Sequence, residues 1–159
     1  MAGMIVILFL SFLLCFALAG PSWFVSWWIT LFYCMNVFWM DFKSYYIPKS
    51  WMAAGCFLCF LWLPFHMEAS LLLGLPCLIL WWKRPDWIGY ADVFYIFLFG
   101  GILGMERMIV CMFAAVFLGF LYGGLFRGRL IPFVSCLCAG FVLSFWRGFL
   151  IYDILCVWK

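Results

Sequence analysis

Apolar runs dominate this chain, and short stretches that carry charge, glycine or proline separate them. A helix needs about 20 predominantly apolar residues to cross the hydrocarbon core of a bilayer. Cutting the chain at its charged and helix-breaking positions leaves seven segments, 3–19, 22–40, 49–65, 68–82, 91–105, 108–126 and 131–157. The pattern predicts an all-α membrane protein, a polytopic bundle of about seven transmembrane helices in a single domain over residues 1–159. The bundle has six if the first or last segment is not a full span.

Two of these segments allow a second interpretation. The first run ends in Ala17-Leu18-Ala19, which has the small-x-small pattern of a signal-peptide cleavage site. No Lys or Arg precedes the run, so the positive region of a signal peptide is missing and we expect a retained helix. The last segment is interrupted by Arg147-Gly148. It either spans as a whole or spans to Phe145 or Trp146 and then continues along the membrane interface.

The composition supports the membrane prediction and excludes several other classes. The chain is 71% hydrophobic and only 9% charged, and a soluble domain of this size has too little polar surface to cover such a core. A net charge of +3 is too small to indicate a nucleic-acid partner. The nine cysteines lie mostly inside apolar runs, and the pair Cys56-x-x-Cys59 has no second pair or histidine beside it. We therefore expect no metal site and no cofactor.

The positive charges fall unevenly on the two sides of the predicted bundle. Seven spans place the loops 41–48, 83–90 and 127–130 on one side. Six of the nine cations lie in or beside these loops, namely Lys43, Lys49, Lys83, Arg84, Arg127 and Arg129, whereas the other side has Arg107 and Lys159. Because loops rich in Lys and Arg stay in the cytoplasm, we expect this side to be cytoplasmic.

Two of the six carboxylates abut apolar runs on that same side. Asp41 follows the second segment directly, and Asp92 lies at the start of the fifth. Asp92 has a structural explanation as an N-terminal helix cap. Asp41 opposes the dipole of its own helix, although a salt bridge to Lys43 or Lys49 could account for it. Two carboxylates held close together share one proton, which is the state that acid–base hydrolysis of a peptide bond requires.

Three short motifs resemble those of the type IV prepilin peptidases. The stretch Asp41-Phe-Lys-Ser-Tyr-Tyr-Ile47-Pro48 is similar to the aspartate-plus-IPN loop of that family, with Lys49 in place of the asparagine. The stretch Gly89-Tyr-Ala-Asp92 resembles the G-x-G-D motif. Near the C-terminus, Ile131-Pro132-Phe133 through Gly140 resembles the I-P-F-G-P-F-L-A-x-G signature. The three motifs occur in the family's order, and together with the apolar run before Asp41 the resemblance covers nearly the whole chain.

The chain departs from the family pattern beside the second aspartate. Ala91 replaces the second glycine of G-x-G-D, which is a mild change if the backbone φ there is negative and a serious one if it is positive. The lysine often found two residues after that aspartate is Phe94 here.

The resemblance implies a membrane aspartyl endopeptidase. Asp41 and Asp92 would be catalytic, with Gly89, Ala91, Pro48 and Pro132 supporting the backbone around them. The enzyme would remove the short basic leader from prepilin-like or preflagellin-like precursors, as in type IV pilus assembly and protein secretion. It would lie in a prokaryotic cytoplasmic membrane with its site toward the cytoplasm, its partners being the precursor and the lipid bilayer. The chain resembles the short form, without the zinc-binding and N-methylating region.

Two other functions stay open. Ala91 and Phe94 are compatible with a catalytically inactive relative that acts in pilus or secretion assembly. The aspartates could also bind protons or cations in a transport component, although no acid lies in the middle of a predicted span. The oligomeric state is not predicted.

Overall fold

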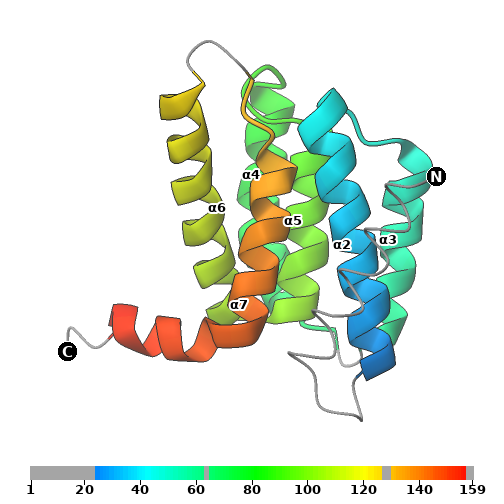
Figure 1. Ribbon diagram of the computed structural model, residues 1–159, viewed down its shortest axis with the longest axis vertical. Helices are drawn as coiled ribbons and strands as arrows, with labels where there is room; N and C mark the ends of the chain where they lie inside the picture. The colour runs from blue at the N-terminus through cyan, green and yellow to red at the C-terminus, as the bar shows by residue number, and fades with distance from the viewer. Residues whose placement is uncertain (1–23, 63–64, 127–129, 157–159) are drawn as a thin grey trace.

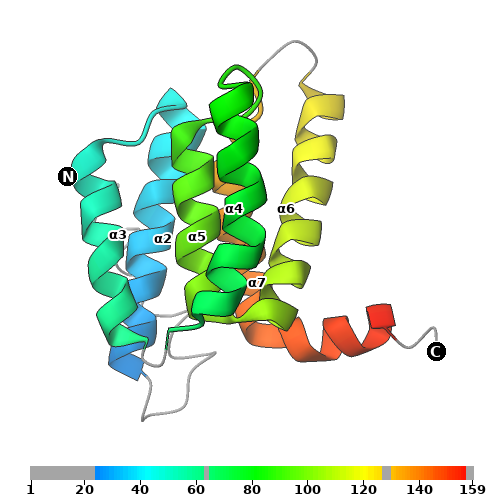
Figure 2. The same cartoon turned by 180° about the vertical axis from the view of Figure 1, so that it is seen from behind.

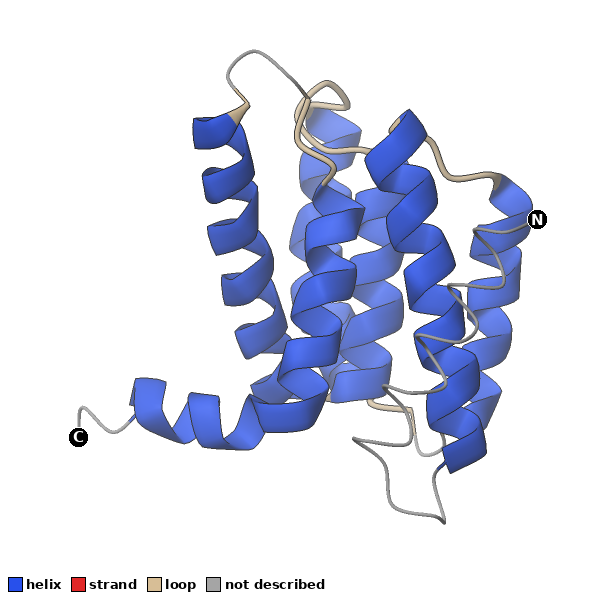
Figure 3. Cartoon of the chain, viewed as in Figure 1, coloured by secondary structure: helices blue, strands red, loops and turns tan. Residues whose placement is uncertain are grey.

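The computed structural model describes residues 24–62, 65–126 and 130–156, and each element in these ranges is a helix (Figure 3). The helices are α2 (Phe24–Ser44), α3 (Lys49–Leu61), α4 (Met67–Lys83), α5 (Tyr90–Leu103), α6 (Met105–Leu125) and α7 (Phe133–Cys156). Each corresponds to one of the predicted segments from the second to the seventh, so the all-helical prediction is confirmed. The predicted segment 3–19, with Ala17-Leu18-Ala19, lies outside the described residues.

One helix in the described part of the chain, α6, is long and apolar enough to cross a membrane. Two further apolar helices, α5 and the part of α7 over Phe133–Gly148, are shorter. The structure thus supports one candidate span by length and composition, and several spans stay a prediction.

Consecutive helices run in opposite directions and are joined by short connections (Figures 1 and 2). The C-terminus of α2 therefore lies at the same end of the bundle as the N-termini of α5 and α7 (Figure 1). This end carries Lys43, Lys49, Lys83 and Arg84, and we call it the basic end. Glu68, Glu106 and Arg107 lie at the opposite end, the far end. The connections after α2 and α4, which are two of the three loops predicted to be cytoplasmic, thus lie at one end of the bundle. Of the third predicted loop, residues 127–129 with Arg127 and Arg129 lie outside the described residues.

Helix α5 occupies the centre of the bundle, because it packs against α3, α4, α6 and α7. Its residues are apolar on every side, as expected of a helix surrounded by others, and Tyr95, Ile96 and Phe99 are at most 1% exposed. The first turn of α5, which contains Asp92, is therefore placed beside the neighbouring helix ends.

Small residues allow the helix pairs around α5 to approach closely. A Cβ atom at Gly100 would lie 3.1 Å from the Cα atom of Ser70 in α4, and the Ser70 hydroxyl donates to the carbonyl of Phe97 at 2.9 Å. Between α6 and α7, a Cβ atom at Gly140 would lie only 2.6 Å from the carbonyl oxygen of Cys111. Gly140, retained from the predicted C-terminal motif, thus has a packing role.

Helix α7 runs along the bundle from the basic end and then turns sideways at the far end (Figure 1). Ser144 donates a hydrogen bond to the carbonyl of Arg107, and a Cβ atom at Gly148 would lie 3.0 Å from Cγ of Arg107. Serine and glycine near one another are a common cause of helix bends. The apolar part of α7 is Phe133–Gly148, which ends within a few residues of Phe145 and Trp146, where the sequence allowed the bundle helix to end.

Candidate active site

Asp41 lies within the last turns of α2 and is only 7% exposed. Its Oδ2 atom accepts two hydrogen bonds from Ser135, one from the main-chain N–H at 2.7 Å and one from the hydroxyl at 2.9 Å. Because Ser135 is in the first turn of α7, the carboxylate also lies at the positive end of that helix dipole. This position offsets the unfavourable one at the C-terminus of α2.

The structural alternative for Asp41, a salt bridge to Lys43 or Lys49, is not formed within the described part of the chain. Both lysine side chains are exposed at the basic end, whereas the carboxylate points into the bundle toward Ser135. The polar partners of Asp41 thus come from α7, which is 94 residues away along the chain.

Asp92 is the third residue of α5, and its Oδ2 atom accepts a hydrogen bond from the main-chain N–H of Gly89 at 2.9 Å. Asp92 is thus not the N-cap residue itself, which is Gly89; it stabilises this helix end by accepting from the N–H of the N-cap residue. A Cβ atom at Gly89 would lie 3.0 Å from Oδ2 of Asp92. Because the φ angle of Gly89 is −76°, glycine is used here for space rather than for an unusual backbone conformation.

Ala91 lies in the first turn of α5 and packs against the core. Among the described residues other than glycine, the one with a positive φ angle is Tyr45. The backbone at Ala91 therefore has a negative φ, which alanine adopts without strain. The replacement of glycine at this position is the mild case of the two considered above.

The two predicted prolines, Pro48 and Pro132, directly precede α3 and α7. Pro48 caps the N-terminus of α3 with an extended backbone (φ −60°, ψ 143°), and its carbonyl accepts from the N–H of Trp51 at 3.0 Å. Pro132 is buried directly before α7, and its carbonyl accepts from the N–H of Cys136 at 3.2 Å. Both prolines start helices at the basic end, where a missing N–H is least harmful.

Three helices place the two aspartates at the same end of the bundle. The C-terminal part of α2 carries Asp41, the first turn of α5 carries Asp92, and α7 packs against both helices. The two side chains are near enough for the charge of Asp41 to act on Asp92. In the described part of the chain both carboxyl groups form their hydrogen bonds through Oδ2, so each Oδ1 stays available to a water molecule or a substrate.

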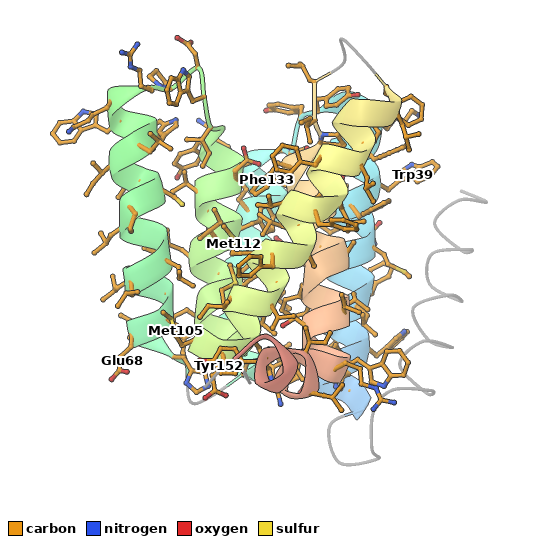
Figure 4. All side chains as sticks on the ribbon, turned by 90° about the vertical axis from the view of Figure 1, so that its left-hand side faces the viewer. Trp39, Glu68, Met105, Met112, Phe133 and Tyr152 are labelled. Carbon is orange, nitrogen blue, oxygen red and sulfur yellow. The ribbon has the colours of Figure 1, made fainter. Side chains whose placement is uncertain are left out.

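Asp92 also lines a cavity of about 630 Å³, which we call the Asp92 groove. The volume lies within the usual range for ligand sites. Phe133, labelled in Figure 4, is part of its wall. The remaining walls are apolar residues of α4, α6 and the two connections at the basic end: Leu80, Trp87, Ile88, Val116, Gly119, Phe120, Leu130 and Ile131. A carboxyl group thus faces a groove that is suited to an apolar chain.

Comparison with protein-family profiles matches residues 23–124 to the type IV leader peptidase family. The chain belongs to this family. The match covers more than half of the chain and includes Asp41 and Asp92, and it ends before α7. The family prediction made from the motifs is confirmed. Comparison with curated proteins and with solved structures gave no significant match.

Two residues that differ from the pattern of leader peptidases line one cavity on the opposite side of α5. Lys49 and Phe94 both border a space of about 600 Å³ between α3 and α5. The aromatic ring of Phe94 packs edge-on against Tyr95. The cation that the family often carries at the position of Phe94 is absent there, and Lys49 supplies a positive charge at the same cavity.

Sequence reasoning missed Ser135, the residue that binds Asp41. Ser135 is 2% exposed and stands where the C-terminal signature of the family has its second proline. A polar residue inside that apolar signature was the available signal. The sequence alone did not indicate which acid it meets, because the contact joins helices far apart along the chain.

Proposed function

We propose that the chain is an aspartic endopeptidase that removes the leader from prepilin-like or preflagellin-like precursors, with Asp41 and Asp92 as its catalytic pair. The observation that carries this proposal is that Asp41 and Asp92 lie at the same end of the bundle, near enough for the charge of Asp41 to act on Asp92, and that Asp92 lines an apolar groove. Membership of a leader peptidase family supports the reaction class.

The chemistry follows from the pairing. Two adjacent carboxyl groups do not ionise easily together, so one keeps its proton while the other is charged. The ionised member takes a proton from a water molecule, which attacks the scissile carbonyl carbon. The protonated member donates its proton to the carbonyl oxygen as the tetrahedral species forms. No metal or cofactor takes part in this scheme.

We also propose that the bundle spans a bilayer several times, with its basic end in the cytoplasm. Large apolar side chains cover its outer surface, an arrangement that is rare in soluble monomers. On α6 these include Phe113, Phe117 and Phe120, which are 63–76% exposed. Charged residues such as Glu68 lie at the helix ends (Figure 4). The sideways part of α7 would then lie along the interface.

In this arrangement the precursor approaches through the lipid. Its apolar segment occupies the Asp92 groove, and its leader remains on the cytoplasmic side with the basic end of the bundle. The scissile bond is held at the depth of the aspartates by the bilayer, which supplies part of the orientation that catalysis requires.

Co-expression with a prepilin-like precursor tests the proposal. The Asp41→Asn and Asp92→Asn variants are compared with the unmodified protein, and the mass of the precursor reports processing. Asp86→Asn is the matched control, because Asp86 is an exposed acid in the connection between α4 and α5 at the same end. We expect processing to be lost in the first two variants and kept in the control. Undiminished processing in either of the first two refutes the pair.

The same experiment separates the alternatives. No processing by the unmodified protein, with a precursor that another leader peptidase cleaves, favours the inactive relative or the transport component over the peptidase.

A further inference from the structure

Ser135 donates two hydrogen bonds to one oxygen of Asp41, and both come from the first turn of α7. The N–H groups of a first turn have no acceptor within their own helix. The Asp41 carboxylate therefore serves as the acceptor that the Ser135 N–H needs. Because Ser135 is 2% exposed and Asp41 7% exposed, bulk water has little access to replace either bond.

The hydroxyl of Ser135 has a choice of two acceptors. Its oxygen lies 2.9 Å from Oδ2 of Asp41 and 3.0 Å from the carbonyl oxygen of Phe38. A hydrogen bond to an ionised acceptor is stronger than one to a neutral carbonyl, so the hydroxyl proton points to Asp41 when that carboxyl is charged. When Asp41 is protonated, the hydroxyl proton can turn to Phe38.

The two aspartates differ in how many donors stabilise their charged form. Asp41 receives two hydrogen bonds from Ser135, whereas Asp92 receives one from Gly89. Hydrogen bonds to a carboxylate favour ionisation. The charge of Asp41 acts on the carboxyl group of Asp92 on α5 and on the thiols of Cys136 and Cys138 on α7. Asp92 is the carboxylic acid among these three groups.

We propose that Ser135 is a positioning residue that keeps Asp41 as the ionised member of the pair, and so leaves the proton on Asp92, beside the Asp92 groove. The assignment of the two catalytic roles rests on the proposed function. Asp41 then activates the water, and Asp92 protonates the carbonyl oxygen of a peptide in the groove.

An infrared titration tests, without any substrate, whether Ser135 favours the ionised form of Asp41. The carboxyl C=O band of Asp41 is followed in the Asp92→Asn protein, where Asp41 is the remaining member of the pair, and is identified by its loss in Asp41→Asn. Ser135→Ala removes the hydroxyl and keeps the main-chain N–H. Loss of a hydrogen bond to a charged group changes the ionisation constant of that group by a factor of about 10 or more. The band of protonated Asp41 should therefore appear in Ser135→Ala at a pH higher by about one unit.

Matched variants separate this effect from general damage. Ser144→Ala removes another buried serine hydroxyl from the same helix, where it bonds Arg107 toward the far end of the bundle, and should leave the band where it is. Ser135→Thr restores a hydroxyl and should restore the titration. Ser135→Cys keeps the volume with a weak donor, and it should move the band in the same direction as Ser135→Ala, which covers the case in which the alanine variant does not fold.

Activity supplies a second readout. In Ser135→Ala, kcat should fall roughly 10-fold at low pH with KM little changed, and the acidic limb of the kcat profile should move to higher pH. An unchanged Asp41 band in both Ser135→Ala and Ser135→Cys overturns the proposal. That outcome is distinct from failure of the peptidase function, which would appear as processing that survives Asp41→Asn.

Discussion

Gly140 lies at a close contact between α6 and α7, which form the most extensive helix pair in the described part of the chain. A Cβ atom there would stand 2.6 Å from the carbonyl oxygen of Cys111 and 3.4 Å from the main-chain nitrogen of Ala115. Both atoms belong to the backbone of α6, so the clash cannot be relieved by rotation of a side chain. Gly140→Ala therefore forces the two helices apart.

The expected size of this effect follows from that contact. Inserting one methyl group into a well-packed interface typically destabilises by about 1–3 kcal/mol, and rigid backbone on one side places Gly140→Ala toward the upper part of this range. The higher helix propensity of alanine opposes the effect by roughly 1 kcal/mol. We expect a net loss of about 1–2 kcal/mol in the free energy of unfolding. Gly140→Val should lose more.

Unfolding in mixed detergent micelles, followed by circular dichroism, measures this difference. Gly124→Ala is the matched control, because Gly124 lies in the last turn of α6 and a Cβ atom added there would have no described atom within 4 Å. This control should be unchanged or slightly more stable. A Gly140→Ala protein as stable as Gly124→Ala would refute the close packing of α6 on α7.

Three further predictions concern the first turn of α5 and the packing of α2 and α3 against this helix. Gly89→Ala places a methyl group 3.0 Å from the Asp92 carboxyl, so leader-peptide cleavage should slow several-fold while the melting temperature stays near that of the unmodified protein. Tyr33→Phe removes the hydroxyl that donates to a carbonyl of α3 at 2.7 Å and pairs with the Tyr95 hydroxyl at 2.8 Å. Denaturant titration should show a loss of about 1–3 kcal/mol in the free energy of unfolding, larger than for Tyr95→Phe. Equal losses in the two variants would contradict this geometry. Ala91→Gly should lower stability by up to about 1 kcal/mol without raising activity, and a marked gain in cleavage rate would show that alanine impairs the site.

The helices could be predicted because charges, glycines and prolines divide the apolar runs at nearly the right places. The ends were less accurate. α2 continues to Ser44 rather than 40, so Asp41 lies inside the helix and not after it, because backbone hydrogen bonding continues past the apolar run. α3 ends at Leu61 rather than 65.

The position of the two aspartates at one end of the bundle was also predictable, since alternating helices bring every second connection to the same side. Their environment was not. The bonds between Asp41 and Ser135 depend on how α7 packs against α2, and the tolerance of Ala91 depends on a backbone angle. Neither property is encoded in local spacing.

The proposed catalytic pair is tested most directly by the cleavage rates of four purified proteins on one prepilin-like precursor: the unmodified protein, Asp41→Asn, Asp92→Asn and the double variant. Acid–base groups typically contribute about 10²–10⁴-fold, so each single variant should slow cleavage by that factor. Because the two groups act as a unit, the double variant should be no slower than the slower single variant. A single variant with undiminished rate, or a double variant whose loss is the product of the two single losses, would contradict a shared catalytic pair.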